Sequence, residues 1–245
     1  MRVALVSDVH LEFWADWGDL FLSELAIDVE GSHADVLVVA GDTCIPQILT
    51  RTLVKLAACA PDVLLTIGNH DVYGSDHATI AAEIRRDAPK NVHLLDRSSV
   101  SIKGTVFAGC TLWPDPMRAP GGPMSSSMDL HRMKQPFNWM PVEHARDVAF
   151  LRSAQADVLV THFVPHRLGI SPRFRGDSGN WYFHVPVDDV VQDICARYVL
   201  FGHTHDPAAF VVPRDDGSHT NYLCNPRGYP REGRCETYRP VYFEF

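Results

Sequence analysis

Five short polar clusters in the sequence combine carboxylates, imidazoles and one amide, each directly after an apolar run. They are Asp8-Val9-His10, Gly41-Asp42, Asn69-His70-Asp71, Thr161-His162 and Gly202-His203-Thr204-His205. Oxygen and imidazole ligands of this kind suit divalent first-row metal ions. The D-x-H and H-x-H spacings place two side chains on the same side of an extended segment, so each pair can grip one ion. The residue types therefore indicate chemistry assisted by metal ions.

The apolar runs before the clusters have the length and β-branched content of buried strands. They are RVALVSD, ADVLVVAGD, DVLLTIGNHD, GTVFAGCTLW, ADVLVTH and RYVLFGHTH. Helical patterns over residues 45–60, 76–88 and 141–154 separate several of them, the second with Asp76 as its N-cap. Strands that alternate with helices predict crossover connections and a largely parallel first sheet.

The last third of the chain is rich in short strands and poor in helix. The stretches PAAFVV, HTNYLCN and PVYFEF follow one another with turns between them. This pattern predicts a second sheet, mixed or antiparallel, packed on the first. The fold class is therefore α/β.

The loops at the carboxyl ends of parallel strands gather along one edge of a sheet, so the five clusters should converge. Two cations ~3.5–4 Å apart, as in two-metal hydrolytic sites, need a shared ligand. A carboxylate has two oxygens and can bridge them, and Asp42 is the candidate.

The ordered series D-x-H, GD, GNHD, H and GHTH resembles the calcineurin-like metallophosphoesterase superfamily along nearly the whole chain. The resemblance implies one domain over residues 1–245 with a four-layer α/β/β/α sandwich of two mixed sheets flanked by helices. It also implies two sets of metal ligands. Residues matching Asp8, His10, Asp42 and His205 hold the first ion in that family, and those matching Asp42, Asn69, His162 and His203 hold the second.

Three further segments, FAGCTLWPD, SPRFRGDSGN and CNPRGYP, resemble a subgroup of small bacterial members of this superfamily. The chain departs from the family pattern after His162, where many members carry a second histidine. Here that position is Phe163, and His166 follows three residues later. The ligand His162 itself is retained.

The chemistry expected of such a site is hydrolysis of a phosphodiester or phosphomonoester by metal-activated hydroxide. The departing alkoxide needs a proton, and the general-acid histidine of the family matches His70, which we expect Asp71 to orient. Arginine forks suit the charge of a transferring phosphate. Arg227, with Asn225 of the same segment, and Arg173 are therefore expected to bind substrate.

The composition of the chain indicates which binding partners and which cellular compartment to expect. The chain has 245 residues, 46% of them hydrophobic, and a formal net charge of −8, which argues against a general nucleic-acid binder and favours a small anionic phosphoester. Its six cysteines form no C-x-x-C pair, which is typical of a reducing setting. The first residues already read as a strand rather than a signal peptide, and no apolar run has membrane-spanning length. We therefore expect a cytoplasmic protein, of undetermined oligomeric state.

Several alternatives stay open at this point. Of the two divalent ions, Mn²⁺ is favoured, with Fe, Zn²⁺ or Ni²⁺ as alternatives. Residues 113–141, rich in Pro, Gly, Ser and Met, are expected to form a lid or insert. A metal-dependent nuclease is the rival enzyme, although such enzymes usually add a DNA-binding domain after the catalytic one, and this sequence ends in a strand. A non-catalytic scaffold of the same fold would be expected to lack some ligands, and every ligand is present.

Overall fold

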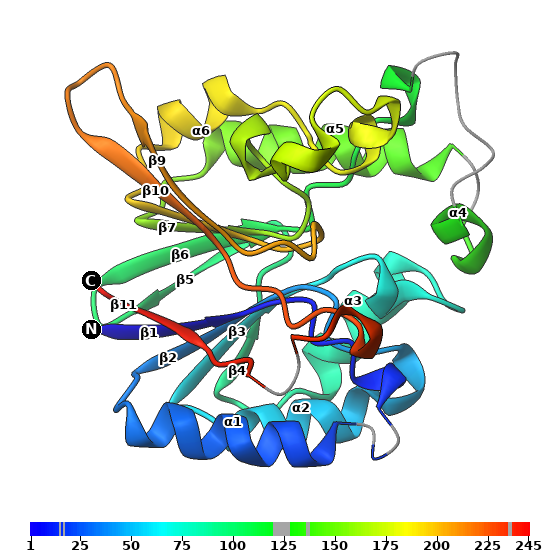
Figure 1. The fold of residues 1–245 in the computed structure, drawn as a ribbon, viewed down its shortest axis with the longest axis vertical. Coiled ribbons are helices and arrows are strands. Elements are labelled where there is room, and N and C mark those ends of the chain that lie inside the picture. Colours follow the sequence, from blue (N-terminus) through cyan, green and yellow to red (C-terminus); the bar gives the residue numbers. More distant parts are fainter. Residues whose placement is uncertain (15, 17, 120–127, 136–137, 235–236) are drawn as a thin grey trace.

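Two β-sheets lie face to face in the middle of the molecule, and helices cover the outer face of each (Figure 1). The computed structural model describes the chain except residues 15, 17, 120–127, 136–137 and 235–236. The layers run helix, sheet, sheet, helix, which confirms the expected α/β/β/α sandwich.

The first sheet has the strand order β11-β1-β2-β3-β4. Its strands are β1 (Arg2–Val6), β2 (Val36–Ala40), β3 (Asp62–Thr66), β4 (Val92–Leu94) and β11 (Val241–Glu244). The first four are parallel, as predicted, because α1 (Asp19–Gly31), α2 (Leu49–Ala57) and α3 (His77–Asp87) return the chain between them. The helices α2 and α3 were expected, whereas α1 was not.

The second sheet has the order β5-β6-β7-β8-β10-β9. Its strands are β5 (Ser98–Ile102), β6 (Thr105–Cys110), β7 (Val158–Thr161), β8 (Tyr198–Phe201), β9 (Ala208–Pro213) and β10 (His219–Cys224). The four central strands are parallel and the two edge strands are antiparallel, so the sheet is mixed, as predicted. The outer face carries α5 (Trp139–Ser153) and α6 (Asp188–Ile194).

Several strands lie in a different sheet from the one expected. The runs that form β6, β7 and β8 were read as part of the first, largely parallel sheet, but they belong to the second. The stretch PVYFEF was assigned to the second sheet, but β11 pairs antiparallel with β1, with Val3 opposite Phe243. A run of apolar and aromatic residues does not by itself specify the edge that it will cover. In this structure the last strand, β11, pairs with the open edge of β1.

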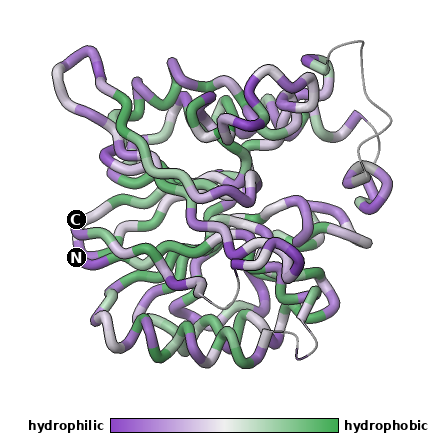
Figure 2. Tube along the Cα trace, in the orientation of Figure 1, coloured by the Kyte–Doolittle hydropathy of each residue, from purple (hydrophilic) through white to green (hydrophobic). Residues whose placement is uncertain are grey.

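The core between the sheets is entirely apolar in its centre. Val3, Leu5 and Val38 of the first sheet meet Phe107 and other side chains of the second, and all are buried. Figure 2 shows the hydrophobic colour concentrated along these strands, with hydrophilic positions on the outer turns. Strands buried on both faces need the continuous apolar runs that were visible in the sequence.

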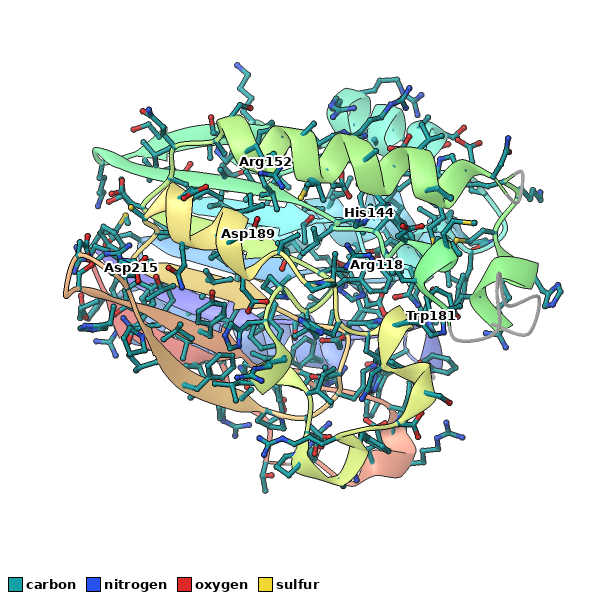
Figure 3. The ribbon with its side chains drawn as sticks, turned by 90° about the horizontal axis from the view of Figure 1, so that it is seen from above. Arg118, His144, Arg152, Trp181, Asp189 and Asp215 are labelled. Atoms are coloured by element: carbon teal, nitrogen blue, oxygen red, sulfur yellow. The ribbon has the colours of Figure 1, made fainter. Side chains whose placement is uncertain are left out.

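Side-chain contacts stabilise several of the helices. The Asp76 carboxylate accepts a hydrogen bond from the backbone N–H of Thr79 at 2.9 Å, which confirms it as the N-cap of α3. On the other side of the molecule, Arg152 of α5 and Asp189 of α6 approach to 3.7 Å, and the two helices lie side by side in Figure 3.

The expected lid or insert, residues 113–141, is described only in part, because 120–127 and 136–137 lie outside the described residues. The described part includes the short helix α4 (Met128–Arg132), which brings Asp129 beside Asn69. Among the described helices, none has the length and apolar character needed to cross a membrane.

Candidate metal centre and active site

The loops that follow β1, β2, β3, β7 and β8 bring the five polar clusters of the sequence together. Because Asp8 and His203 come from different sheets, the site lies where the two sheets end side by side. The backbone N–H of His203 donates to Asp8 Oδ1 at 2.8 Å and joins the two halves directly.

One group of potential ligands consists of Asp8, His10, Asp42 and His205, whose ligand atoms lie within 4.8 Å of one another. His10 Nε2 and His205 Nε2 are 2.9 Å apart. His205 Nε2 is 3.7 Å from Asp8 Oδ1, and His10 Nε2 is 3.6 Å from Asp42 Oδ2. Four donor atoms facing one small volume match a cation site.

A second group consists of Asp42, His162 and His203, again within 4.8 Å. The oxygen Asn69 Oδ1 lies 2.9 Å from His162 Nε2, which in turn lies 3.5 Å from Asp42 Oδ1. The two oxygens of Asp42 therefore face different groups, Oδ2 toward the first and Oδ1 toward the second. This is the arrangement expected of a bridging carboxylate.

In three of these imidazoles, the nitrogen Nδ1 lies at hydrogen-bonding distance from an acceptor oxygen. Glu12 Oε1 is 3.3 Å from His10 Nδ1, and Glu232 is 3.1 Å from His205 Nδ1. His162 Nδ1 is 3.0 Å from the carbonyl oxygen of Ala40, which can only accept, so Nδ1 carries the proton. Such partners fix the ring and leave Nε2 with its lone pair directed at the centre, as in known metal sites.

The electrostatics of the site also fit cations. Burial, followed by the charges of Asp8 and Asp71, raises the pKa of Asp42 well above its usual value. Burial lowers the pKa of His10 to about 4 and that of His203 well below its ordinary value, so both rings are neutral at pH 7. Among the described residues, Asp8 Oδ2 and His203 Nε2 are buried without a hydrogen-bond partner. Divalent ions would satisfy these atoms and neutralise the crowded carboxylates.

The argument from the D-x-H and H-x-H spacings assumed an extended backbone. The backbone at the site is instead turned. Asp8, His10, Asp42, His203 and His205 all have φ between 45° and 70°, in the left-handed region. For residues with a side chain this conformation costs roughly 1–3 kcal/mol each. The tight left-handed turns, rather than strand alternation, aim these side chains at one point.

Two glycines leave room for the ligands. A Cβ on Gly68 would overlap the carboxylate and backbone N of Asp42. A Cβ on Gly202 would lie 2.6 Å from the carbonyl oxygen of Ala40 and 2.7 Å from Asp8 Oδ2. Glycine is needed at these positions because the loops approach one another too closely for any side chain.

The ring of His70 is buried beside the ligands, with a partner on each nitrogen. Nδ1 lies 2.9 Å from Glu12 Oε1, and Nε2 lies 3.0 Å from the hydroxyl oxygen of Tyr229. Glu12 thus contacts both His70 and His10 with the same oxygen. His10, Glu12 and His70 form a third group of close ligand atoms, but the separations are those of hydrogen bonds.

The prediction that Asp71 orients His70 is wrong. Its two carboxylate oxygens accept hydrogen bonds from four backbone N–H groups, those of Asp42, Thr43, Cys44 and Gly68, at 2.7 to 3.0 Å. Asp71 therefore ties the loop after β2 to the loop after β3. Its buried position is structural, and Glu12 occupies the place at the ring.

Arg227 and Asn225 also have structural positions, contrary to the expectation that they bind substrate. The Arg227 guanidinium is buried between Trp14 and Phe21, 3.8 and 4.0 Å from the two ring centroids. Asn225 Nδ2 donates to the carbonyl oxygen of Leu5 at 2.8 Å and fastens the loop after β10 to β1. The aromatic partners of Arg227 are more than 200 positions away in the sequence, so no local signal indicated this burial.

Arg173 lies where a substrate-binding arginine is expected. It lines the candidate cavity and is held by Asp206, whose two oxygens accept from its Nη2 at 2.9 Å. The side chain is largely exposed, so it can reach a ligand in that cavity.

Phe163, at the departure from the family pattern, is a core residue. Its ring is buried and packs against His203 at a centroid distance of 4.2 Å and against Trp113 at 5.4 Å. His166 does not replace the missing histidine, because its Nε2 is 3.1 Å from Asp188 on the outer helix α6. Phe163 thus supports the candidate ligand His203 by packing.

The candidate active-site cavity has a volume of about 480 Å³. It is lined by four of the candidate metal ligands, Asp42, Asn69, His203 and His205. Other side chains around it include His70, Arg173, Trp181 and Tyr229. Trp181, labelled in Figure 3, belongs to the segment between β7 and α6. This volume is sufficient for a small organic phosphate.

Glu12, Glu232 and Asp129 belong to the site but were not expected there. Glu12 stands two positions after His10, which was a usable signal, since carboxylates commonly orient metal-binding histidines. Glu232 is 27 positions from His205, and Asp129 is 60 from Asn69, so their contacts follow only from the tertiary structure.

The chain belongs to the calcineurin-like phosphoesterase family, whose model matches residues 1–207. The resemblance inferred from the motifs is thereby confirmed, and with it the class of a metallophosphoesterase. A search among curated proteins finds no significant match.

Solved structures of similar fold come from distant relatives. A phosphopantetheinyl hydrolase from Mycobacterium tuberculosis is 18% identical with a TM-score of 0.75, over 98% of this chain and 95% of that one. A dimetal phosphatase from Danio rerio is 13% identical with a TM-score of 0.54, over 91% and 86%. A Thermus thermophilus protein is 13% identical with a TM-score of 0.56, over 99% and 98%. At these identities the likeness shows the shared fold.

Proposed function

We propose that this protein hydrolyses a small phosphodiester or phosphomonoester at a centre of two divalent ions, held by Asp8, His10, Asp42 and His205 and by Asp42, Asn69, His162 and His203. The observation that carries the proposal is the position of the Asp42 carboxylate between the two ligand groups. Its Oδ2 lies 3.6 Å from His10 Nε2 in the first group, and its Oδ1 lies 3.5 Å from His162 Nε2 in the second. When bound, two such cations neutralise the charge of a phosphate ester and lower the pKa of a water that can attack it. Mn²⁺ is the favoured ion.

The chain's own residues supply binding and a proton. Asn69, His203 and the other ligands define where the scissile phosphate lies in the cavity. His70 stands at its edge and is the general acid of the proposal, giving its Nε2 proton to the departing oxygen. Arg173, which lines the same cavity, contacts the phosphate or its substituent.

Glu12 is the positioning residue of this scheme. An acceptor at Nδ1 makes that nitrogen the donor toward Glu12 and sets the orientation of the ring. The same carboxylate oxygen also lies 3.3 Å from Nδ1 of His10, so one side chain sets both a metal ligand and the proton donor. Glu12 takes the place that was first assigned to Asp71.

The experiment that tests the proposal is hydrolysis before and after metal removal. Purified protein is treated with a chelator, dialysed, and assayed on mono- and bis-p-nitrophenyl phosphate with Mn²⁺, Zn²⁺, Fe²⁺ or Ni²⁺ added back. We expect activity to vanish on chelation and to return with at least one ion, whereas Asp42→Asn should stay inactive with every ion. Activity that survives chelation would refute the metal-dependent reaction.

A further inference from the structure

A second cavity of about 520 Å³ adjoins the candidate active-site cavity. The two cavities share His70, Asp129 and Tyr229 among their lining residues. Beyond this boundary, the second cavity is lined by Phe13, Tyr73, Arg132, Pro230 and Arg231. It therefore begins at the proposed general acid and extends away from the metal ligands.

The side chains at this boundary make polar contacts with one another that a bound substrate could replace with its own. The Tyr229 hydroxyl lies 3.0 Å from His70 Nε2, the nitrogen that donates the proton in the proposed reaction. Asp129 accepts a hydrogen bond from the Tyr73 hydroxyl and lies 3.1 Å from Asn69 Nδ2. A departing oxygen at His70 would take the place of the Tyr229 hydroxyl, so the alcohol attached to it would point into the second cavity.

This cavity carries positive charge that is not committed to an ion pair. The Arg132 guanidinium lies 5.2 Å from the Tyr73 ring centroid, and that of Arg231 lies 5.4 Å from the Tyr229 ring centroid. Within the described part of the chain, neither guanidinium has a carboxylate at ion-pair distance. Arg173 in the first cavity, by contrast, is bound to Asp206. Two uncommitted arginines at one cavity in a chain of net charge −8 indicate an anionic ligand.

We propose that the second cavity binds the leaving group, and that the natural substrates are phosphoesters whose leaving alcohol carries a further anionic group, a carboxylate or a second phosphate. This inference rests on the proposed function and names the substrate class. In the reaction, the water oxygen forms a new bond to phosphorus, the bond from phosphorus to the alcohol oxygen breaks, and His70 protonates that oxygen. Arg132 and Arg231 then hold the anionic group of the released alcohol, while Phe13 and Tyr73 contact its carbon skeleton.

The test compares three aryl phosphates: phenyl phosphate, 3-carboxyphenyl phosphate and 1,3-phenylene bisphosphate. Phenol and 3-carboxyphenol lose their protons with nearly equal ease, so their esters differ chiefly in charge. We expect the metal-loaded protein to favour the carboxylated ester or the bisphosphate over phenyl phosphate by at least about ten-fold in kcat/KM, an effect of ~1.4 kcal/mol. The better of the two charged esters identifies the anionic group.

The variant for this test is the double substitution Arg132→Gln with Arg231→Gln, which keeps much of each side-chain stem. It should bring the ratio between charged and neutral esters to about one. Arg167→Gln, an exposed arginine lining a different cavity, serves as the matched control and should keep the wild-type ratio. Metal content equal to that of the wild type verifies that each variant is folded.

Two outcomes overturn the inference while the proposed function stands: equal hydrolysis of all three esters by the wild type, or a preference that survives in the double variant. Absence of hydrolysis of all three esters and of the nitrophenyl phosphates, with metal restored, contradicts the proposed function itself. The two failures are therefore distinguishable.

Discussion

His70 is the residue whose proposed role depends most on the atoms around it. Its two ring nitrogens face Glu12 and Tyr229, and its backbone N–H donates to Asp42 Oδ1 at 2.8 Å. The backbone contact supports the bridging carboxylate and survives a side-chain substitution. Removal of the imidazole should therefore affect proton donation more than metal binding.

We expect His70→Ala to retain nearly all bound metal and to slow hydrolysis of esters with poor leaving groups by about 10²-fold or more, the usual contribution of a general acid. Esters with good leaving groups, such as p-nitrophenyl phosphate, should be affected much less because the departing oxygen needs little protonation. The measurement is kcat across a series of aryl esters together with metal analysis. Loss of the metal from the variant would show that the general-acid role is wrong.

Glu12→Gln should reduce kcat for poor leaving groups by roughly 10–100-fold, the usual effect of removing a carboxylate behind a functional histidine. Glu12→Asp, which keeps the charge, should restore part of this loss. In the double variant with His70→Ala, the loss should not exceed that of His70→Ala alone, because Glu12 acts through the ring. If the kcat losses of the two single variants instead multiply in the double variant, Glu12 acts through His10 and the metal rather than through His70.

At the scale of elements, hydrogen bonds between the Asp71 carboxylate and backbone N–H groups join the loops after β2 and β3. Asp71 binds four N–H groups across them, and Gly68 lies against Asp42 with no room for a Cβ. The position of the Asp42 carboxylate, the proposed bridging ligand, is thus determined by the approach of two loops.

Gly68→Ala should displace the Asp42 carboxylate and weaken metal binding, although the strand β3 itself remains intact. We expect metal affinity to fall at least about ten-fold and activity to recover only in part with excess metal, as is seen when the shell around a metal site is disturbed. Gly104→Ala, at a hairpin where nothing lies within 4 Å of the added carbon, tests the general effect of such a substitution, although its positive φ adds local strain. Unchanged metal affinity in Gly68→Ala would contradict the close approach.

A buried polar network anchors α3 beside the sheets. Asp96 Oδ1 is 3.0 Å from His77 Nε2, and Arg85 donates to Asp96 Oδ2 at 2.7 Å. The indole of Trp113 donates to His77 Nδ1 at 3.2 Å, so His77 donates to Asp96 through Nε2. Burial alone would raise the pKa of Asp96, but the hydrogen bond from His77, the charge of Arg97 and the hydrogen bond from Arg85 hold it well below its usual value.

Because the pKa of Asp96 is lower in the folded protein, its contribution to stability is present above the unfolded value of about 3.9 and is lost as the pH falls toward the folded value. Asp96→Asn should lower the free energy of unfolding by about 2 kcal/mol at pH 7. The difference from the wild type should shrink from about pH 5 downward. Urea unfolding at pH 7 and pH 3.5 measures it, and a difference independent of pH would show that the carboxylate charge is not the cause.

Sequence and structure agree best on elements whose signal is local. The parallel strands of the first sheet, the Asp76 cap of α3 and the clustering of polar residues after strands all follow from short-range patterns. The pairing of β11 with β1 and the burial of Arg227 between Trp14 and Phe21 depend on segments distant in the chain. The left-handed turns at Asp8 and His10 have only a weak signal in residue type, because neither residue is glycine, although Asp and His adopt this conformation more often than most residues.

At the scale of the whole molecule, two sheets of similar design end at one place and contribute to one site. Asp8, His10, Asp42 and Asn69 follow strands of the first sheet, and His162, His203 and His205 follow strands of the second. That residues 113–141 form a lid or insert stays a proposal, supported in the described part of this range by Asp129 of α4, which lines both cavities. Cytoplasmic location also stays a prediction.

The central claim is that this edge holds two divalent ions bridged by Asp42. Native mass spectrometry with elemental analysis, on protein reconstituted with Mn²⁺ and freed of excess metal, tests it most directly. The structure predicts about two ions per chain in the wild type and a clear reduction in Asp42→Asn, because both ligand groups lose the shared carboxylate. Fewer than one ion per wild-type chain, or equal occupancy in the variant, would contradict a bridged dinuclear centre.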